Sequence, residues 1–248
     1  MSERIRNRPF CVKETPVTIT VTGRVRLTEV RPGTCFFPEN ILIDPDMSQR
    51  IRRHVDPFQC KVPVTVNDWL EPYRAHGQGD IWLDLGCGKG EFLAALAEAH
   101  PGIFFIGIEV RKRIADKYFP NYKHLPNLLL LHGNVSLSIP SMMDHRKVQR
   151  VFINFPDPYD YKARYKKRQM VNKGLVEGLC EILAPGGVTS VKTDNKTLFE
   201  DMDTLLSVHL QPIPAPAATS AGPVALSEWE NERRNKSVRV YSREYMLR

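Results

Sequence analysis

A glycine-rich loop follows an apolar stretch that ends near residue 86. Residues 81–86 have the composition of a buried strand, and Gly86, Gly88 and Gly90 stand at alternate positions after it. Glycine allows the backbone to turn sharply and to approach a ligand closely. The spacing Gly-x-Gly-x-Gly differs from the Gly-x-Gly-x-x-Gly of dinucleotide-binding enzymes. The loop therefore predicts a ligand-binding turn, and the kind of ligand has to be inferred from the neighbouring residues.

Three polar side chains stand at the ends of successive strand-like stretches. Asp84, just before the glycines, suits an ammonium group. Glu109 follows the last glycine by nineteen residues, where an acid suits two ribose hydroxyls. Asn134 suits the edge of an adenine. For any one of them alone the simpler interpretation is favoured, with Asp84 and Asn134 as local caps and Glu109 as a solvated strand end. Together they favour S-adenosylmethionine, which has an amino acid end, a ribose and an adenine but no pyrophosphate.

A stiff turn follows the fourth strand-like stretch, at residues 154–159 with the sequence Asn-Phe-Pro-Asp-Pro-Tyr. Proline cannot continue a sheet, so two prolines end the strand and restrict the turn. At the carboxyl end of a parallel strand, such a turn directs Asp157 into the expected ligand crevice. The simpler interpretation is a structural turn with an exposed aspartate.

A basic run follows this turn directly. Residues 161–168 contain five cations and two tyrosines, the composition expected for phosphate contacts and base stacking. Charge runs are usually solvated faces, but this one stands next to the presumed reaction centre. It is the densest part of the chain's positive excess, which is +7 overall.

Strand-like and helix-like stretches alternate from about residue 80 onward. Strand composition recurs at 104–110, 128–131, 151–155 and 188–191, and helical spacing at 91–100, 111–124, 170–183 and 197–210. Such alternation predicts an α/β fold, with a mostly parallel, doubly wound sheet. Pro120 is expected to end or interrupt the second helix.

Two segments fall outside this pattern. Residues 1–78 are interpreted as an N-terminal extension of unknown role, with a strand around residues 17–21 and a helix beginning within 67–73; residues 79–248 form the catalytic domain. Residues 211–226, rich in proline and alanine, are interpreted as a loop.

Composition excludes several classes of protein. The 248 residues are enough for a full core, and no apolar run approaches the length that spans a bilayer. Five scattered cysteines indicate free thiols in a cytoplasmic protein, and seven histidines form no recognisable metal motif. We therefore expect neither a metal site nor a membrane association, and composition leaves the oligomeric state open.

These motifs together resemble the tRNA (guanine-N7)-methyltransferases, a family of class I S-adenosylmethionine-dependent enzymes. The resemblance covers roughly residues 80–248, and its most specific part is the Phe-Pro-Asp-Pro turn followed by the basic run. The Lys-Thr-Asp-Asn stretch at 192–195 and the Ser-Glu-Trp-Glu stretch at 227–230 agree with it.

The resemblance implies a Rossmann-like fold, tRNA as partner and a role for each matched residue. It implies cofactor contacts for Asp84, Gly86, Gly88, Glu109, Asn134 and Asp157. It further implies that Asp157 is the catalytic residue. Substrate-binding positions are implied for Lys162, Asp194, Ser227 and Glu230.

The chain departs from the family pattern at several positions. Asp84 replaces a more common glutamate, Asn134 replaces the usual aspartate, and Ser227 replaces threonine. The spacer after the proline turn is one residue longer, so either Tyr161 or Lys162 takes the family's lysine position. Two alternatives stay open: an exocyclic-amine methyltransferase, and a non-catalytic RNA-binding scaffold with the same fold, which only Asn134 supports.

Overall fold

The structure, a computed structural model, describes residues 10–11, 35–36, 57–139, 141–159, 168–214 and 227–247. The chain divides into two compact units, Met1–Arg53 and His54–Arg248. In the first unit, β1 (Phe10–Cys11) pairs antiparallel with β2 (Cys35–Phe36). The strand expected around residues 17–21 lies outside the described residues.

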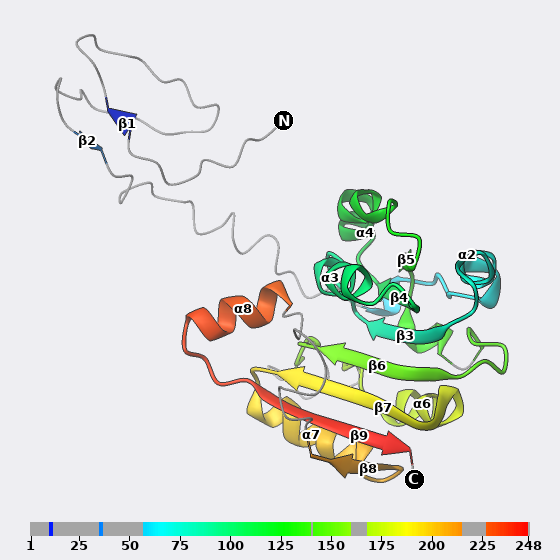
Figure 1. The fold of residues 1–248 in the computed structure, drawn as a ribbon. Helices are drawn as coiled ribbons and strands as arrows, with labels where there is room; N and C mark the ends of the chain where they lie inside the picture. The colour runs from blue at the N-terminus through cyan, green and yellow to red at the C-terminus, as the bar shows by residue number, and fades with distance from the viewer. Residues whose placement is uncertain are drawn as a thin grey trace. The chain divides into compact units, whose positions relative to one another are not determined.

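A seven-stranded sheet forms the centre of the second unit (Figure 1). Its strands in spatial order are β5 (Leu128–His132), β4 (Ile103–Glu109), β3 (Asp80–Leu85), β6 (Val148–Asn154), β7 (Leu183–Thr193), β9 (Tyr241–Leu247) and β8 (Leu210–Ile213). The strands from β5 to β7 are parallel, and β9 runs antiparallel between β7 and β8. The predicted α/β fold with a mostly parallel, doubly wound sheet is confirmed.

Helices cover both faces of this sheet. The helices described in this unit are α2 (Leu70–His76), α3 (Glu91–Ala99), α4 (Lys112–Tyr118), α5 (Val135–Ser138), α6 (Lys173–Ile182), α7 (Lys196–Leu206) and α8 (Glu228–Asn235). Helices α6 and α7 pack on one face and α3 on the other (Figure 1). Among the helices of the described ranges, none is both long and apolar enough to cross a membrane.

Both faces of the sheet are buried. Leu83 and Val151 belong to a large apolar cluster that also includes Leu179 of α6. On the opposite face, Phe152 meets Phe92 of α3 edge to face, with ring centroids 5.0 Å apart. Parallel strands that are buried on both faces have continuous apolar sequences, so their positions could be predicted from the sequence.

The segment upstream of β3 is part of the same core. After the short helices η2 (Pro57–Gln59) and η3 (Val66–Asp68), Trp69 is fully buried and its Nε1 donates to the carbonyl of Met142 at 2.8 Å. The compact unit therefore begins at His54, and the expected boundary between residues 78 and 79 falls inside it.

The α-helix ends before Pro120, as expected: α4 stops at Tyr118, and Pro120 lies in the 3-10 helix η4 (Phe119–Tyr122) that follows. One further expectation differs from the structure. Part of the stretch interpreted as a loop, residues 211–213, belongs to β8. Pro212 is tolerated there because β8 is an edge strand with one unpaired side. Residues 215–226 lie outside the described residues.

Candidate active site

The glycine loop joins β3 to α3 at the carboxyl edge of the sheet. Gly86 and Gly88 have φ angles of 88° and 59°, in the left-handed region that favours glycine. The backbone N–H groups of Gly86 and Cys87 both donate to the carbonyl of Ile108, at 2.8 and 3.0 Å. The loop is thereby fixed against the end of β4.

Asp84 lies beneath this loop as a buried carboxylate. Only 2% of the residue is exposed, and its Oδ1 has no hydrogen-bond partner within the described ranges. Burial, and then the nearby charge of Glu109, raises the pKa of Asp84 to about 8. A buried acceptor without a partner is costly unless a ligand satisfies it. The surroundings of Asp84 therefore fit a bound ammonium group.

Glu109 ends β4 and is equally buried, but its carboxylate is already paired. Its Oε1 accepts from the backbone N–H and from Nε of Arg111, both at 2.8 Å. Its Oε2 accepts from the N–H of Gly88 at 3.0 Å and from the second guanidinium nitrogen of Arg111 at 3.1 Å. Since a carboxylate has about four acceptor positions, Glu109 uses its full capacity within the chain.

Asn134 follows β5 and is the N-cap of α5, with 5% of the residue exposed. Its Oδ1 accepts from the N–H of Ser136 at 3.0 Å. Its Nδ2 donates to the carbonyls of Pro57 and Cys60, at 2.8 and 3.0 Å. The structure thus places Asn134 at the expected strand end, with its amide facing the upstream segment.

The proline turn after β6 is held at both ends. Phe155 has a φ of 51°, and its N–H donates to the carbonyl of Lys192 at 2.8 Å. The amide of Gln169 donates to the carbonyl of Pro158 at 2.7 Å. Asp157, between these anchors, is exposed. Although burial lowers the pKa of Arg111, its hydrogen bonds with Glu109 and the charges of Glu109 and Asp157 raise it above its ordinary value.

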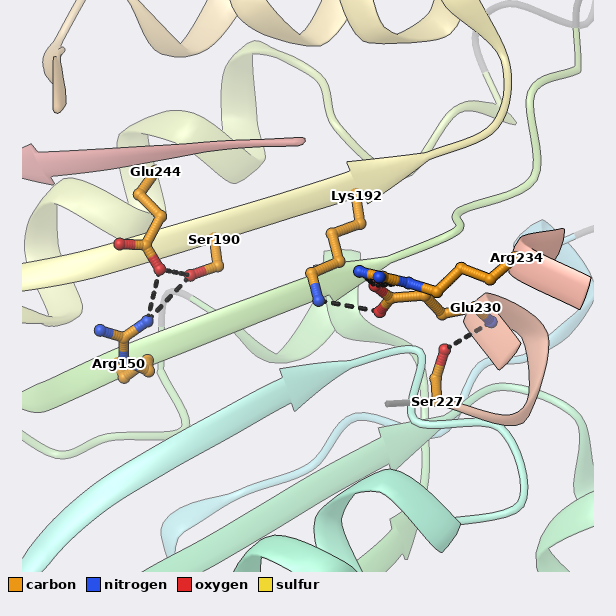
Figure 2. A network of polar contacts seen from close by, with 7 residues as sticks. All are labelled: Arg150, Ser190, Lys192, Ser227, Glu230, Arg234 and Glu244. Carbon is orange, nitrogen blue, oxygen red and sulfur yellow. Dashed lines mark hydrogen bonds and ion pairs between the residues drawn. The ribbon is translucent and has the colours of Figure 1, made fainter. Parts of the chain in front are cut away.

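A polar network joins β7 to α8, as Figure 2 shows. Glu230, of which 2% is exposed, accepts from Lys192 at 2.8 Å and from Arg234 at 2.8 Å. The Ser227 hydroxyl caps α8 by accepting from the N–H of Glu230 at 3.1 Å. Asp194 forms an ion pair with Arg233, with 3.0 Å between Oδ2 and Nε. The structure therefore brings three predicted substrate residues, Asp194, Ser227 and Glu230, to the end of β7.

A second network on the same face ties β6, β7 and β9 together (Figure 2). Arg150 donates to Glu244 at 2.6 Å and to the Ser190 hydroxyl at 3.1 Å. Ser190 in turn donates to Glu244 at 2.7 Å. These contacts fix the antiparallel strand β9 against the parallel part of the sheet.

Three residues of the site had no role predicted from the sequence. Arg111 had a local signal, since it follows Glu109 by two residues. Lys192 had none, because its partner Glu230 is 38 positions away in the chain. Asn154 has a buried Nδ2 with no partner among the described residues, at the end of β6 beside the proline turn. The predicted Lys162 lies outside the described residues.

A cavity of about 390 Å³ lies away from these residues. It is lined by residues that precede β6 and β7, among them Asp144, Arg146 and Glu181, so it opens at the opposite edge of the sheet. Within the described ranges, no three histidines, cysteines or acids are grouped as they would be to hold a metal ion.

Two proteins named tRNA (guanine-N(7)-)-methyltransferase are similar to this chain. The one from Synechococcus sp. (strain JA-3-3Ab) is 30% identical over 193 residues, which cover 76% of this chain and 81% of that protein. The one from Thermosynechococcus vestitus (strain NIES-2133 / IAM M-273 / BP-1) is 33% identical over 172 residues, covering 67% and 79%.

The family model described as "Putative methyltransferase" matches residues 78–242. Among solved structures, the 16S rRNA methyltransferase KamB is similar with a TM-score of 0.50, over 75% of this chain and 99% of that one. At 13% identity, this likeness shows the fold alone. The family match over more than half of the chain and the two relatives show that the chain belongs to the tRNA (guanine-N(7)-)-methyltransferase family.

Proposed function

We propose that this protein transfers a methyl group from S-adenosylmethionine to N7 of a guanine in tRNA. One observation carries the proposal: the buried carboxyl group of Asp84, which has no partner among the described residues, lies one residue before the end of β3, and the turn bearing Asp157 follows the neighbouring strand β6. The strand order reverses between these two strands, and ligands of doubly wound sheets bind at such a point. Membership of the family supports the reaction.

The residues of the carboxyl edge fit S-adenosylmethionine in part. When bound, this molecule supplies an electrophilic methyl group on a sulfonium sulfur. In the proposal, Asp84 binds its ammonium group and Gly86 and Gly88 keep the loop close to it. Glu109 binds the ribose hydroxyls only after Arg111 releases the carboxylate, because all its acceptor positions are occupied in the structure.

Methylation of guanine N7 requires alignment more than proton transfer, because N7 already exposes a lone pair. The protein therefore has to hold N7 in line with the methyl group and the sulfur. The purine becomes cationic during the reaction, and a nearby carboxylate stabilises that charge. We assign this role to Asp157 and Asp194, which accept hydrogen bonds from the guanine N1–H and amino group. For Asp194 this requires that it exchange its ion pair with Arg233 for the base.

The basic run at residues 161–168 is the proposed contact for tRNA phosphates. Four cations of the C-terminal region are less suited, because acids of the chain already pair with them. These pairs are Arg233 with Asp194, Arg234 with Glu230, Lys236 with Glu232 and Arg243 with Asp203. The proposal further places the protein in the cytoplasm, where tRNA is modified.

The test is nucleoside mass spectrometry of unmodified tRNA after incubation with the protein and isotope-labelled S-adenosylmethionine. We expect labelled 7-methylguanosine, and strand cleavage at that position after borohydride and aniline treatment. Labelled N-methylated bases that resist this cleavage would instead identify an exocyclic-amine methyltransferase. Binding of tRNA without any binding of S-adenosylmethionine would identify a non-catalytic scaffold.

The assignment of the carboxylates has its own test. Both Asp157→Asn and Asp194→Asn are expected to lower kcat, and Asp157→Asn more strongly, because Asp194 first has to exchange its ion pair with Arg233 for the base. Full turnover by Asp157→Asn together with an inactive Asp194→Asn would reverse the assignment.

A further inference from the structure

The side-chain amide of Asn134 is committed to a segment more than 70 residues upstream. An asparagine amide has two N–H donors, and Asn134 uses both on the carbonyl oxygens of Pro57 and Cys60. Because both neighbours are carbonyl oxygens, the nitrogen has to face them. No N–H of this side chain is left for the edge of an adenine.

Further hydrogen bonds continue this attachment along α5 as far as Ser138, its last residue. The N–H of Asn134 donates to the carbonyl of Val62 at 2.8 Å. The N–H of Val64 donates to the Ser138 hydroxyl at 2.8 Å, and that hydroxyl donates to the carbonyl of Asn134 at 2.7 Å. Val64 itself is 1% exposed. Residues 57–64, which we call the upstream strap, are thus attached along their length to the carboxyl end of β5.

We propose that Asn134 is a positioning residue that fixes the upstream strap as the wall of the cofactor crevice beside β5. The proposal rests on the proposed function in that the ligand of this crevice is S-adenosylmethionine. It also gives a physical reason for asparagine at this position. A carboxylate would have no proton to donate, and it would face two carbonyl oxygens at about 3 Å. The aspartate typical of the family is therefore unsuited to this chain.

Asn127 offers a matched control at the other end of β5. It is 4% exposed, and its Nδ2 also donates to backbone carbonyls, those of Ala97, His100 and Ile103, at 2.9 to 3.2 Å. It precedes β5, so it lies at the edge of the sheet away from the proposed site. Asn127→Asp removes the same kind of contact from a place where no ligand is expected.

The experiment compares Asn134→Asp, Asn127→Asp and the unmodified protein. Dissociation constants for S-adenosylhomocysteine are measured by calorimetry, and melting temperatures by differential scanning calorimetry. Alkylation of Cys60 in the strap is followed by peptide mass spectrometry, with the buried Cys87 as reference in the same digest.

We expect both variants to melt at lower temperature, but only Asn134→Asp to change the site. Its dissociation constant should rise at least tenfold and its Cys60 should alkylate at least fivefold faster, with Cys87 unchanged. In turnover, the KM for S-adenosylmethionine should rise while kcat and the KM for tRNA stay within twofold. Asn127→Asp should leave the dissociation constant within twofold.

The proposal is overturned if Asn134→Asp binds the ligand as tightly as the unmodified protein, or if both variants lose affinity in proportion to their melting temperatures. Should Asn134→Asp not fold, Ser138→Ala removes the second attachment of the strap and is expected to give the same changes, about threefold. If the unmodified protein binds no S-adenosylhomocysteine, the proposed function fails, while Cys60 alkylation still tests whether Asn134 holds the strap.

Discussion

Asp84 and Glu109 end neighbouring parallel strands, and each is 2% exposed, yet their surroundings are opposite. Glu109 receives four hydrogen bonds, three of them from Arg111. Asp84 has an oxygen without a partner in the described part of the chain, and its pKa is raised to about 8. Two equally buried acids at this edge therefore differ in the partners that the chain gives them.

The two acids therefore differ in when they find a partner: Glu109 has one within the chain, whereas Asp84 is expected to find one in the ligand. The charge of Glu109 is stabilised before any ligand arrives, so this residue contributes to the folded state itself. Asp84 makes no comparable contribution, and a cationic ligand is the partner that its position favours. Substitution of Glu109 should therefore lower the free energy of unfolding. Substitution of Asp84 should lower the affinity for the ligand and leave the free energy of unfolding almost unchanged.

The largest effect on stability is expected from Glu109→Gln. It leaves the guanidinium of Arg111 without its counter-charge, and breaking a buried pair typically costs about 3–5 kcal/mol. Because the Arg111 side chain is 38% exposed and reaches water, we expect a smaller loss of about 2–3 kcal/mol in the free energy of unfolding. Urea denaturation measures it. A loss below about 0.5 kcal/mol would mean that Glu109 is no more tied to the fold than Asp84.

Asp84→Asn is expected to affect affinity instead. Hydrogen bonds to charged groups contribute about 1.5–3 kcal/mol, so the dissociation constant for S-adenosylhomocysteine should rise roughly 10- to 100-fold. The free energy of unfolding should stay the same or increase slightly, because an unpaired buried carboxyl group is replaced by a neutral amide. Calorimetric titration and urea denaturation of the same preparation test both parts. A destabilised variant with unchanged affinity would contradict the comparison.

The pH dependence of binding provides a third test. Free protein below pH 8 carries mostly protonated Asp84, which must lose its proton to pair with an ammonium group. Affinity should therefore rise at least about tenfold from pH 6 to pH 8. It should fall again at higher pH, once the amino group of the ligand loses its proton. Titrations in buffers of different ionisation enthalpy should show proton release near pH 7, which Asp84→Asn abolishes. A flat profile for the unmodified protein would contradict this origin.

The same raised pKa affects the fold in the opposite direction. An acid whose pKa is about 8 in the folded protein and 3.8 in the reference state binds more protons when folded between these values. The contribution of Asp84 to stability therefore falls as the pH rises from about 4 to 8. Affinity rises over the same range, so the two properties are separable at this residue.

The sequence predicts which residues lie at the site better than it predicts which residues contact one another there. The ends of β3 and β4 were predictable because strands buried on both faces are continuous apolar runs, and β5 could be recognised by its four consecutive leucines. The pairing of Glu109 with Arg111 could also have been predicted, because the two residues are only two positions apart. The pairing of Lys192 with Glu230, and of Asn134 with Pro57 and Cys60, was not, because contacts between distant segments are decided by the topology of the sheet.

The smallest effect is expected from Arg111→Lys, which keeps the charge beside Glu109 and changes only its shape. The guanidinium contacts both carboxylate oxygens at once, at 2.8 and 3.1 Å, whereas an ammonium group acts as a single point charge. The backbone N–H groups of residues 88 and 111 still donate to Glu109 in this variant. We therefore expect a loss of about 1 kcal/mol in the free energy of unfolding, less than for Glu109→Gln. A smaller loss would mean that Glu109 stabilises the fold mainly because a positive charge stands beside it. A loss equal to that of Glu109→Gln would instead show that this stabilisation depends on the two-point geometry of arginine.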